Sequence, residues 1–86
     1  MKDGINILPS GATAWSMNDK FHREDGPAVE YLSGTTCWYL NGLRHREDGP
    51  AIEWNNGYNE WFIHGEKVDC MTNEEFLRIV KLKVFL

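Results

Sequence analysis

The residue types best suited to chemistry stand together in one heptapeptide, His-Arg-Glu-Asp-Gly-Pro-Ala, which occurs twice, at residues 22–28 and 45–51. An imidazole beside carboxylates can act as a general acid or base, or supply ligands to a metal ion. Consecutive side chains of an extended segment point alternately to opposite sides, however, and do not converge on one atom. Two intact copies also argue against a catalytic site, which normally joins unequal partners. We therefore expect no catalytic residue, metal ligand or cofactor, although a metal-assisted hydrolase using His22 or His45 is the enzymatic alternative.

The heptapeptide also has a structural interpretation. Arg23 and Arg46 would pair with carboxylates of the neighbouring repeat, each histidine would bond to turn carbonyls, and Asp-Gly-Pro would shape a bend. Period-related side chains stack as ladders in repeat folds, which favours this pairing. The functional interpretation instead leaves the arginines free to bind a ligand.

The heptapeptides belong to a longer repetition with a period of 23 residues. At that offset three sets of residues coincide: Gly11, Gly34 and Gly57; Trp15, Trp38 and Trp61; Met17, Leu40 and Ile63. The third copy stops matching near Lys67, where Val68 and Asp69 stand in place of heptapeptide letters. We therefore predict two full units and a fraction, at about 11–33, 34–56 and 57–69, within a β-repeat region of residues 1–71.

Turn signals divide each unit into short strands. Asn41-Gly42 lies between apolar segments, and both central residues of a type I′ hairpin turn need a positive φ, which Asn and Gly accept. Ser33-Gly34 and Asn56-Gly57 mark the next turns. The fold class we predict is mainly β, an antiparallel meander with a C-terminal helix.

Alternation along the strands assigns side chains to two faces. We expect the three period-related tryptophans, with Met17, Leu40, Ile63, Val29 and Ile52, to form an apolar core layer. Ser16, Tyr39, Phe62, Glu30 and Glu53 are expected on the opposite, more open face. Tyr39 and Phe62 are therefore the aromatic residues that we expect to be available for contact.

The Asn-Gly hairpin "NGLRH" followed by an "NNG" turn, at a period of 23, resembles the MORN repeat from about Gly11 to Lys67. The resemblance implies an elongated, single-layer antiparallel meander. The family's middle Gly-x-Gly step is replaced here by Arg46 to Pro50. This "HREDGPA" variant is similar to repeats of small tailed-bacteriophage proteins, which implies a phage origin.

Composition restricts the possible partners. The chain has 13 acidic residues against nine Lys and Arg, a formal charge of −4, whereas proteins that bind long nucleic acids are usually basic. No apolar run is long enough to cross a bilayer, and we expect no membrane partner. Cys37 and Cys70 lack metal-site spacing and are expected to be free thiols in the cytoplasm, that of the host cell if the protein comes from a phage.

The last residues predict a helix from about Asn73 within a capping and oligomerisation segment, residues 72–86. Thr72 can cap its N-terminus, and Glu75 follows three residues later, as in a capping box. Phe76, Leu77, Val80 and Val84 would share the face that packs on the tryptophan layer, although "VKLKVFL" also alternates like a strand. The further apolar residues Ile79, Leu82, Phe85 and Leu86 favour a homodimer or higher homo-oligomer.

A non-enzymatic binding protein is the function that these patterns favour. Arginine forks bind phosphate and aromatic faces stack on bases, which predicts a site for a small cyclic nucleotide. The candidate ligand-binding residues are Arg23, Arg44, Arg46, Tyr39, Phe62 and His45. The phage resemblance implies a counter-defence sponge that sequesters such a signal; the alternative is an inhibitor that binds a host enzyme or defence protein through the repeat sheet.

Overall fold

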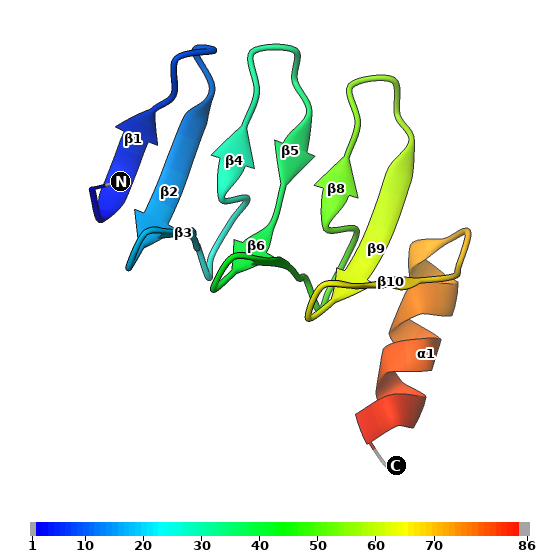
Figure 1. Ribbon diagram of the computed structural model, residues 1–86. Coiled ribbons are helices and arrows are strands. Elements are labelled where there is room, and N and C mark those ends of the chain that lie inside the picture. The colour runs from blue at the N-terminus through cyan, green and yellow to red at the C-terminus, as the bar shows by residue number, and fades with distance from the viewer. Residues whose placement is uncertain (1, 85–86) are drawn as a thin grey trace.

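The computed structural model describes the backbone of residues 2–84 and the side chains of residues 2–82. The protein is mainly β: antiparallel strands follow one another as a meander, and one helix stands at the C-terminal end (Figure 1). The upright strands are β1 (Gly4–Ile7), β2 (Thr13–Met17), β4 (Val29–Glu30), β5 (Thr36–Cys37), β8 (Ile52–Glu53) and β9 (Asn59–Ile63). The shorter strands are β3 (Lys20–Phe21), β6 (Tyr39–Leu40), β7 (Leu43–Arg44) and β10 (Glu66–Val68), and the helix is α1 (Asn73–Val84).

The sheet follows chain order, as a meander requires. Its strand order is β1-β2-β4-β5-β8-β9-β10, with β3 paired to β2 and with β6 and β7 forming a separate hairpin. In Figure 1 the short strands β3, β6 and β10 run across the lower ends of the upright strands. The predicted antiparallel meander with a C-terminal helix is thus confirmed.

Two kinds of turn alternate along the meander. At the lower hairpins, Asn41 and Gly42 both have positive φ (50° and 83°), as a type I′ turn needs, and His64-Gly65 repeats this pattern. Each upper turn ends on a glycine with positive φ, whose N–H bonds to the carbonyl three residues earlier. At the turn between β4 and β5, Gly34 N–H donates to the Tyr31 carbonyl at 3.0 Å. Gly57 N–H donates to the Trp54 carbonyl in the same way, so the turn chemistry repeats with the sequence.

The main core lies on the opposite face from the one expected. It consists of small and aliphatic residues that pack with aromatic residues of the lower hairpins: Ala12, Ala14, Val29, Cys37, Ala51, Ile52 and Phe62, with Leu8, Phe21, Trp38 and Tyr39 partly buried against them. Phe62, expected on the open face, is buried, and Tyr39 is half-buried. Ala14 and Val29 are small enough for the aromatic rings of the hairpins to pack over them, so that face closes on itself.

The strand register explains why the predicted faces were wrong. Val29 pairs with Ala14 and Cys37, whereas Glu30 pairs with Thr13 and Thr36, one position away. The glutamates therefore lie on the tryptophan face, and Val29 and Ile52 lie on the other. A shift of one residue exchanges the faces of a whole strand, and alternation within one strand does not fix its register with the next.

Helix α1 begins where the capping box predicts. The Thr72 hydroxyl accepts a hydrogen bond from Glu75 N–H at 3.2 Å, and the Glu75 carboxylate accepts one from Met71 N–H at 3.1 Å. Phe76 is fully buried, and Ile79 and Val80 pack beside it, but Leu77 is exposed, contrary to the expected face. The chain is helical through Val84; the side chain of Val84 and residues 85–86 lie outside the described part.

The helix covers only one end of the tryptophan face rather than the whole layer. Phe76 packs against Trp61 and Val68, whereas Trp15 and Trp38 remain half-buried beyond the reach of α1. Among residues 2–84 no helix is long and apolar enough to cross a membrane.

Candidate functional site

Each heptapeptide arginine covers a tryptophan of its own unit. The guanidinium carbon of Arg23 lies 4.0 Å from the centroid of the Trp15 ring, and that of Arg46 lies 4.1 Å from Trp38. At these distances a guanidinium is attracted to the negative face of the ring and shields it from water. The arginines therefore partly cover the Trp15 and Trp38 rings, on the part of the tryptophan face that the helix does not reach.

The rest of the heptapeptide holds the arginine in place. Arg46 Nε donates to Asp48 at 2.8 Å and Nη1 donates to the Pro50 carbonyl at 3.1 Å; Arg23 makes the same two bonds with Asp25 and Pro27. Arg46 also pairs with Glu53 at 3.0 Å. The arginines thus bond within their own unit, not to a neighbouring repeat as the structural interpretation expected, because Asp two residues later is nearer than any carboxylate of the next unit.

Glycine and alanine in the motif have steric reasons. A Cβ atom at Gly49 would lie 2.8 Å from Cζ of Arg46, and one at Gly26 would lie 2.8 Å from Cζ of Arg23. Only glycine leaves room for the guanidinium there. Ala51, like Ala28, is fully buried, so the last letter of the motif belongs to the core.

Each heptapeptide histidine fastens its unit to the hairpin of the next. Nδ1 of His22 accepts a hydrogen bond from Asn41 N–H at 3.0 Å, and Nδ1 of His45 accepts one from His64 N–H at 2.9 Å. In the neutral imidazole the proton is therefore on Nε2, which for His45 faces Glu47 at 3.4 Å. The histidines accept backbone N–H groups instead of bonding to turn carbonyls, which corrects the expectation.

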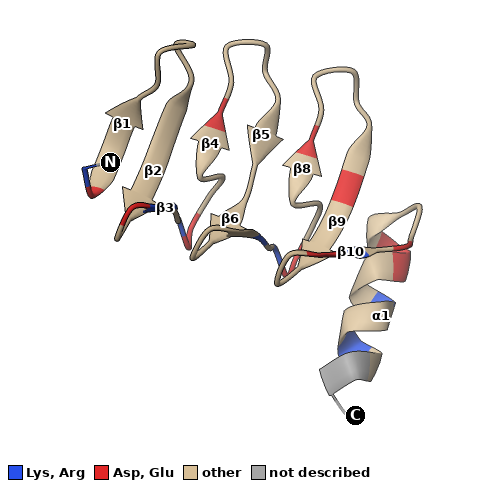
Figure 2. Ribbon diagram, viewed as in Figure 1, with Lys and Arg blue, Asp and Glu red and all other residues tan. Residues whose placement is uncertain are grey.

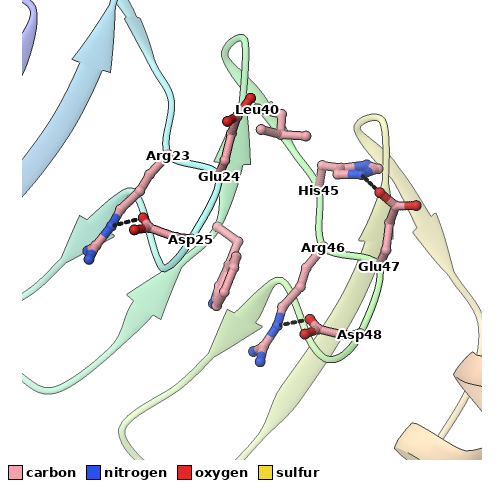
Figure 3. A pocket seen from close by; sticks show the side chains of 9 residues that line it. Arg23, Glu24, Asp25, Leu40, His45, Arg46, Glu47 and Asp48 are labelled. Atoms are coloured by element: carbon pink, nitrogen blue, oxygen red, sulfur yellow. Dashed lines mark hydrogen bonds and ion pairs between the residues drawn. The ribbon is translucent and has the colours of Figure 1, made fainter.

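Two grooves, one repeat apart, lie along the tryptophan face beside the heptapeptides. The first groove, of about 700 Å³, is lined by Trp15, Met17, His22, Arg23, Glu24 and Asp25, together with Asp3, Gly4, Ser16 and Asn41. The second groove, of about 630 Å³, is lined by Trp38, Leu40, His45, Arg46, Glu47 and Asp48, together with Arg23, Glu24 and Asp25 (Figure 3). Six lining positions correspond at the 23-residue period, so the fold presents the same surface twice.

The rim of the grooves is acidic. The second groove has two guanidinium groups against four carboxylates, and both guanidinium groups already bond to an aspartate. The side chains of Glu24 and Glu47 are 82% and 75% exposed. Figure 2 shows charged residues along the lower ends of the strands and on α1, with further acidic residues on β4, β8 and β9, whereas the upper turns have none. The charged groups that remain exposed at the rim of the grooves are therefore negative.

At the third repeat position the chain's own helix occupies the place of a groove. Trp61 Nε1 donates to Asn73 Oδ1 at 3.1 Å, and Phe76 packs on the Trp61 ring at a centroid distance of 6.4 Å. Asn73 Nδ2 donates to the Asp48 carbonyl at 3.4 Å, which ties the helix to the second heptapeptide. The residue that corresponds to Arg46 in this unit is Asp69, which leaves the Trp61 ring for the helix to cover.

The six residues predicted as ligand-binding separate into two groups. Arg23, Arg46 and His45 line the second groove, but their polar atoms are largely engaged within the chain. Arg44, Tyr39 and Phe62 lie together on the opposite face; these three form the Arg44 cluster. Arg44 lies 5.4 Å from the buried Phe62 ring and is the cross-strand partner of Tyr39. A hydrogen bond with Tyr39 raises the pKa of the Arg44 guanidinium.

Sequence reasoning missed the surface residues of the grooves. Glu24 and Glu47 are not among the candidate ligand-binding residues, and Trp38 and Leu40 were expected in the core, but all four line the second groove. The signal that identifies them is the repetition of a whole set, aromatic, aliphatic and acidic, at one spacing. Within the described residues no group of three or more His, Cys, Asp or Glu side chains is arranged to hold a metal ion. Cys37 and Cys70 are free, as predicted, and burial raises the pKa of both thiols.

Comparison with known proteins finds no family model, curated protein or solved structure that matches this chain.

Proposed function

We propose that this protein is a non-enzymatic binding protein that recognises a basic, amphipathic helix of a protein partner in the two grooves of its tryptophan face. The observation that carries the proposal is the repetition of the grooves, each with an aromatic and aliphatic floor and an acidic rim. The polar heptapeptide side chains bond within the chain, so they serve to build the surface. Repeat sheets offer rigid surfaces of this kind to protein partners.

The charge of the grooves selects the sign of the partner. Glu24, Asp25, Glu47 and Asp48 are all more than 70% exposed and lie at the rim. Exposed rim charges contribute mainly to association rate and specificity, while the apolar floor contributes most of the affinity. Lysine or arginine residues beside an apolar anchor therefore complement this surface, and an anionic ligand does not.

Helix α1 supplies an example of a suitable occupant within the same chain. At the third repeat position it presents Asn73, Phe76 and Val80, at helical spacing, to the tryptophan side of the sheet. Apolar anchors at such spacing are the usual way in which an amphipathic helix enters a groove. A partner helix with an aromatic anchor would enter the first and second grooves beside the arginine that covers each tryptophan ring, whereas α1 packs on Trp61 directly.

The test uses two matched peptide probes and the full chain. The first probe has the sequence of residues 72–84, cross-linked on its outer face to keep it helical; the second differs only in Lys at the two glutamates of its first turn. We expect the lysine probe to bind about tenfold more tightly at low salt, measured by fluorescence anisotropy, with the preference shrinking as salt rises. Equal affinities, or no binding of either probe, would contradict the proposal.

The control is a change of sign at the rim. The double variant Glu24→Lys and Glu47→Lys is expected to prefer the first probe, which keeps both glutamates, because the rim is then basic. Glu24 and Glu47 are exposed and pair with the histidines of their heptapeptides, so the variant should keep the fold. The variant Glu74→Lys makes the same kind of substitution once, on the exposed side of α1 and away from the grooves, and should leave the preference unchanged. The double variant raises the net charge by about four and Glu74→Lys by about two, so a preference that follows net charge alone would change in Glu74→Lys about half as much as in the double variant.

The Arg44 cluster favours a second candidate function, capture of a small cyclic nucleotide. Arg44 is exposed beside Tyr39, and Lys67 pairs across the hairpin with Phe62. A planar fork beside aromatic rings is suited to a phosphate and a base. The protein would be incubated with cyclic di- and trinucleotides, heated, and the released nucleotide analysed by chromatography. Two results together support this function: the parent protein removes a nucleotide from solution and releases it intact on heating, and Arg44→Ala does not remove it. If the parent protein removes no nucleotide, this function is excluded.

We also propose that the 23-residue unit is a variant of the MORN repeat and that the protein acts in the cytoplasm against a host defence. The Asn41-Gly42 hairpin and the period support the first statement, and the "HREDGPA" resemblance supports the second. In a pulldown from bacterial lysate, we expect the parent chain to capture one host protein. The double variant Glu24→Lys and Glu47→Lys should no longer capture it.

A further inference from the structure

Strand β1 is an open edge of the sheet with an apolar surface. It pairs on one side with β2, and among residues 2–84 no strand pairs with its other side. Its side chains Ile5 and Ile7 are 59% and 70% exposed. An apolar edge strand with free backbone groups tends to pair with another strand, which natural proteins normally prevent with charge, proline or a covering element.

The backbone of Ile5 and Ile7 points away from β2. Ile5 is the cross-strand partner of Trp15, and Trp15 N–H donates to the Ala28 carbonyl on the other side of β2 at 2.7 Å. Ile5 and Trp15 are therefore a non-hydrogen-bonded pair, in which both residues direct their N–H and C=O groups outward. Ile7, two positions along, faces the same way. The edge thus offers two donors and two acceptors from apolar residues.

The three residues Ile5-Asn6-Ile7 of this edge read the same in both directions around Asn6. A two-fold axis at Asn6 places Ile5 opposite Ile7 of the partner subunit and forms two hydrogen-bonded pairs, about four hydrogen bonds in all. An axis at Ile5 would place Ile7 opposite the partner's Asp3, and an axis at Ile7 would place Ile5 opposite the partner's Pro9, which has no N–H to donate. Only the Asn6 register pairs isoleucine with isoleucine throughout.

From this edge we propose that the protein forms a symmetric dimer through β1, in which two copies join into one continuous antiparallel sheet centred on Asn6. The side chain of Asn6 is already fixed by hydrogen bonds to Ser16 Oγ at 3.0 Å and to the Lys2 carbonyl at 2.7 Å, so the strand is held ready for pairing. The axis brings the first grooves of the two subunits next to each other on one face. The oligomer therefore uses the edge of the sheet, and not helix α1 as the sequence suggested.

The test measures the mass of the full chain by light scattering after gel filtration. The parent protein is expected at twice the 10.0 kDa of one chain, and the double variant Ile5→Lys and Ile7→Lys at the monomer mass. Both isoleucines are exposed, so the variant should keep its circular dichroism spectrum. The control is Leu82→Lys, which places one lysine on an exposed apolar position of α1 and should leave the dimer intact.

A cross-link checks the register. In a Cys70→Ser background, Asn6→Cys places two thiols across the axis, and mild oxidation is expected to give a dimer that is stable without reductant. In the control Ile5→Cys each thiol lies opposite Ile7 of the partner subunit, two positions along the strand from the partner's thiol, and should remain largely uncross-linked. A parent chain that is monomeric at about 100 μM, a dimer lost in Leu82→Lys but kept in the isoleucine variant, or equal cross-linking of both cysteine variants would overturn the proposal.

Discussion

Trp15, Trp38 and Trp61 occupy the same place in three successive units, but they are covered in two different ways. In the first two units an arginine eight residues later lies over the ring at about 4 Å. In the third unit Asp69 stands at that position, and Phe76 of α1 covers the ring instead. The first two units are therefore completed by their own side chains, whereas the third unit needs a separate element. Terminal units of repeat proteins commonly differ in this way.

The largest expected effect breaks the cover of the last unit. Phe76→Ala removes a fully buried ring from the small cluster it forms with Trp61 and Val68, and should lower the free energy of unfolding by about 3 to 5 kcal/mol. Urea denaturation followed by circular dichroism measures the change. The neighbouring Leu77→Ala, on the exposed side of the helix, should cost less than about 1 kcal/mol. Similar losses in both variants would show that α1 does not pack on Trp61.

A smaller effect tests the arginine cover of the second unit. Gly49→Ala places a methyl group 2.8 Å from Cζ of Arg46, so the flexible side chain must leave the Trp38 ring. We expect a loss of about 1 to 2 kcal/mol, close to that of Arg46→Ala. The double variant should be no less stable than Arg46→Ala alone, because both changes remove the same contact. Additive losses would mean that Gly49 has a different role.

The helix cap should have an effect near 1 kcal/mol. Thr72→Ala removes the acceptor for Glu75 N–H, while Thr72→Ser retains it. Thermal unfolding of the two variants side by side isolates the hydroxyl. If the alanine and serine variants had the same melting temperature, the Thr72 hydroxyl would not contribute to the stability of helix α1 on the last unit.

The smallest expected effect concerns a second difference between units. Glu60, where the preceding unit has Cys37, accepts a hydrogen bond from Trp54 Nε1 at 2.7 Å and pairs with Lys67 at 3.3 Å. These contacts, the Trp54 bond first, lower the pKa of Glu60 below its ordinary value of 4.5. A lowered pKa in the folded state stabilises above the unfolded pKa, and this contribution disappears as the pH falls through the folded pKa. The stability difference between the parent chain and Trp54→Phe should therefore be full at pH 7 and shrink below about pH 4.5.

Local signals in the sequence predicted most of the fold. Asn41-Gly42 and the glycine turns require positive φ, and the Thr72 to Glu75 box begins a helix, so each could be placed without knowledge of the tertiary structure. The faces of the sheet could not be placed in this way. Both sets of alternating residues contain apolar side chains, and the pairing of Val29 with Ala14 depends on strand register. Phe62 was consequently expected to be open and is buried.

The candidate site was harder to predict, because its grooves are formed by residues from several segments that come together only in the fold. Arginine beside acidic residues is compatible with ligand binding and with internal bonding, and the choice depends on whether Asp25 lies within reach of Arg23. The tertiary structure shows that it does. The grooves emerge only when the heptapeptides and the tryptophans are placed side by side.

The histidine contacts have a consequence for how such a chain can change its length. His22 and His45 each reach forward 19 residues, to the hairpin of the next unit, and the longest of the hydrogen bonds described above spans 25 residues. A second copy of residues 34–56, inserted after the first, could make the same histidine contacts with the units on both sides of it. Strand β1 and helix α1 would keep their present contacts. Growth by whole modules, each bringing one more docking place, is therefore open to this architecture through ordinary gene duplication.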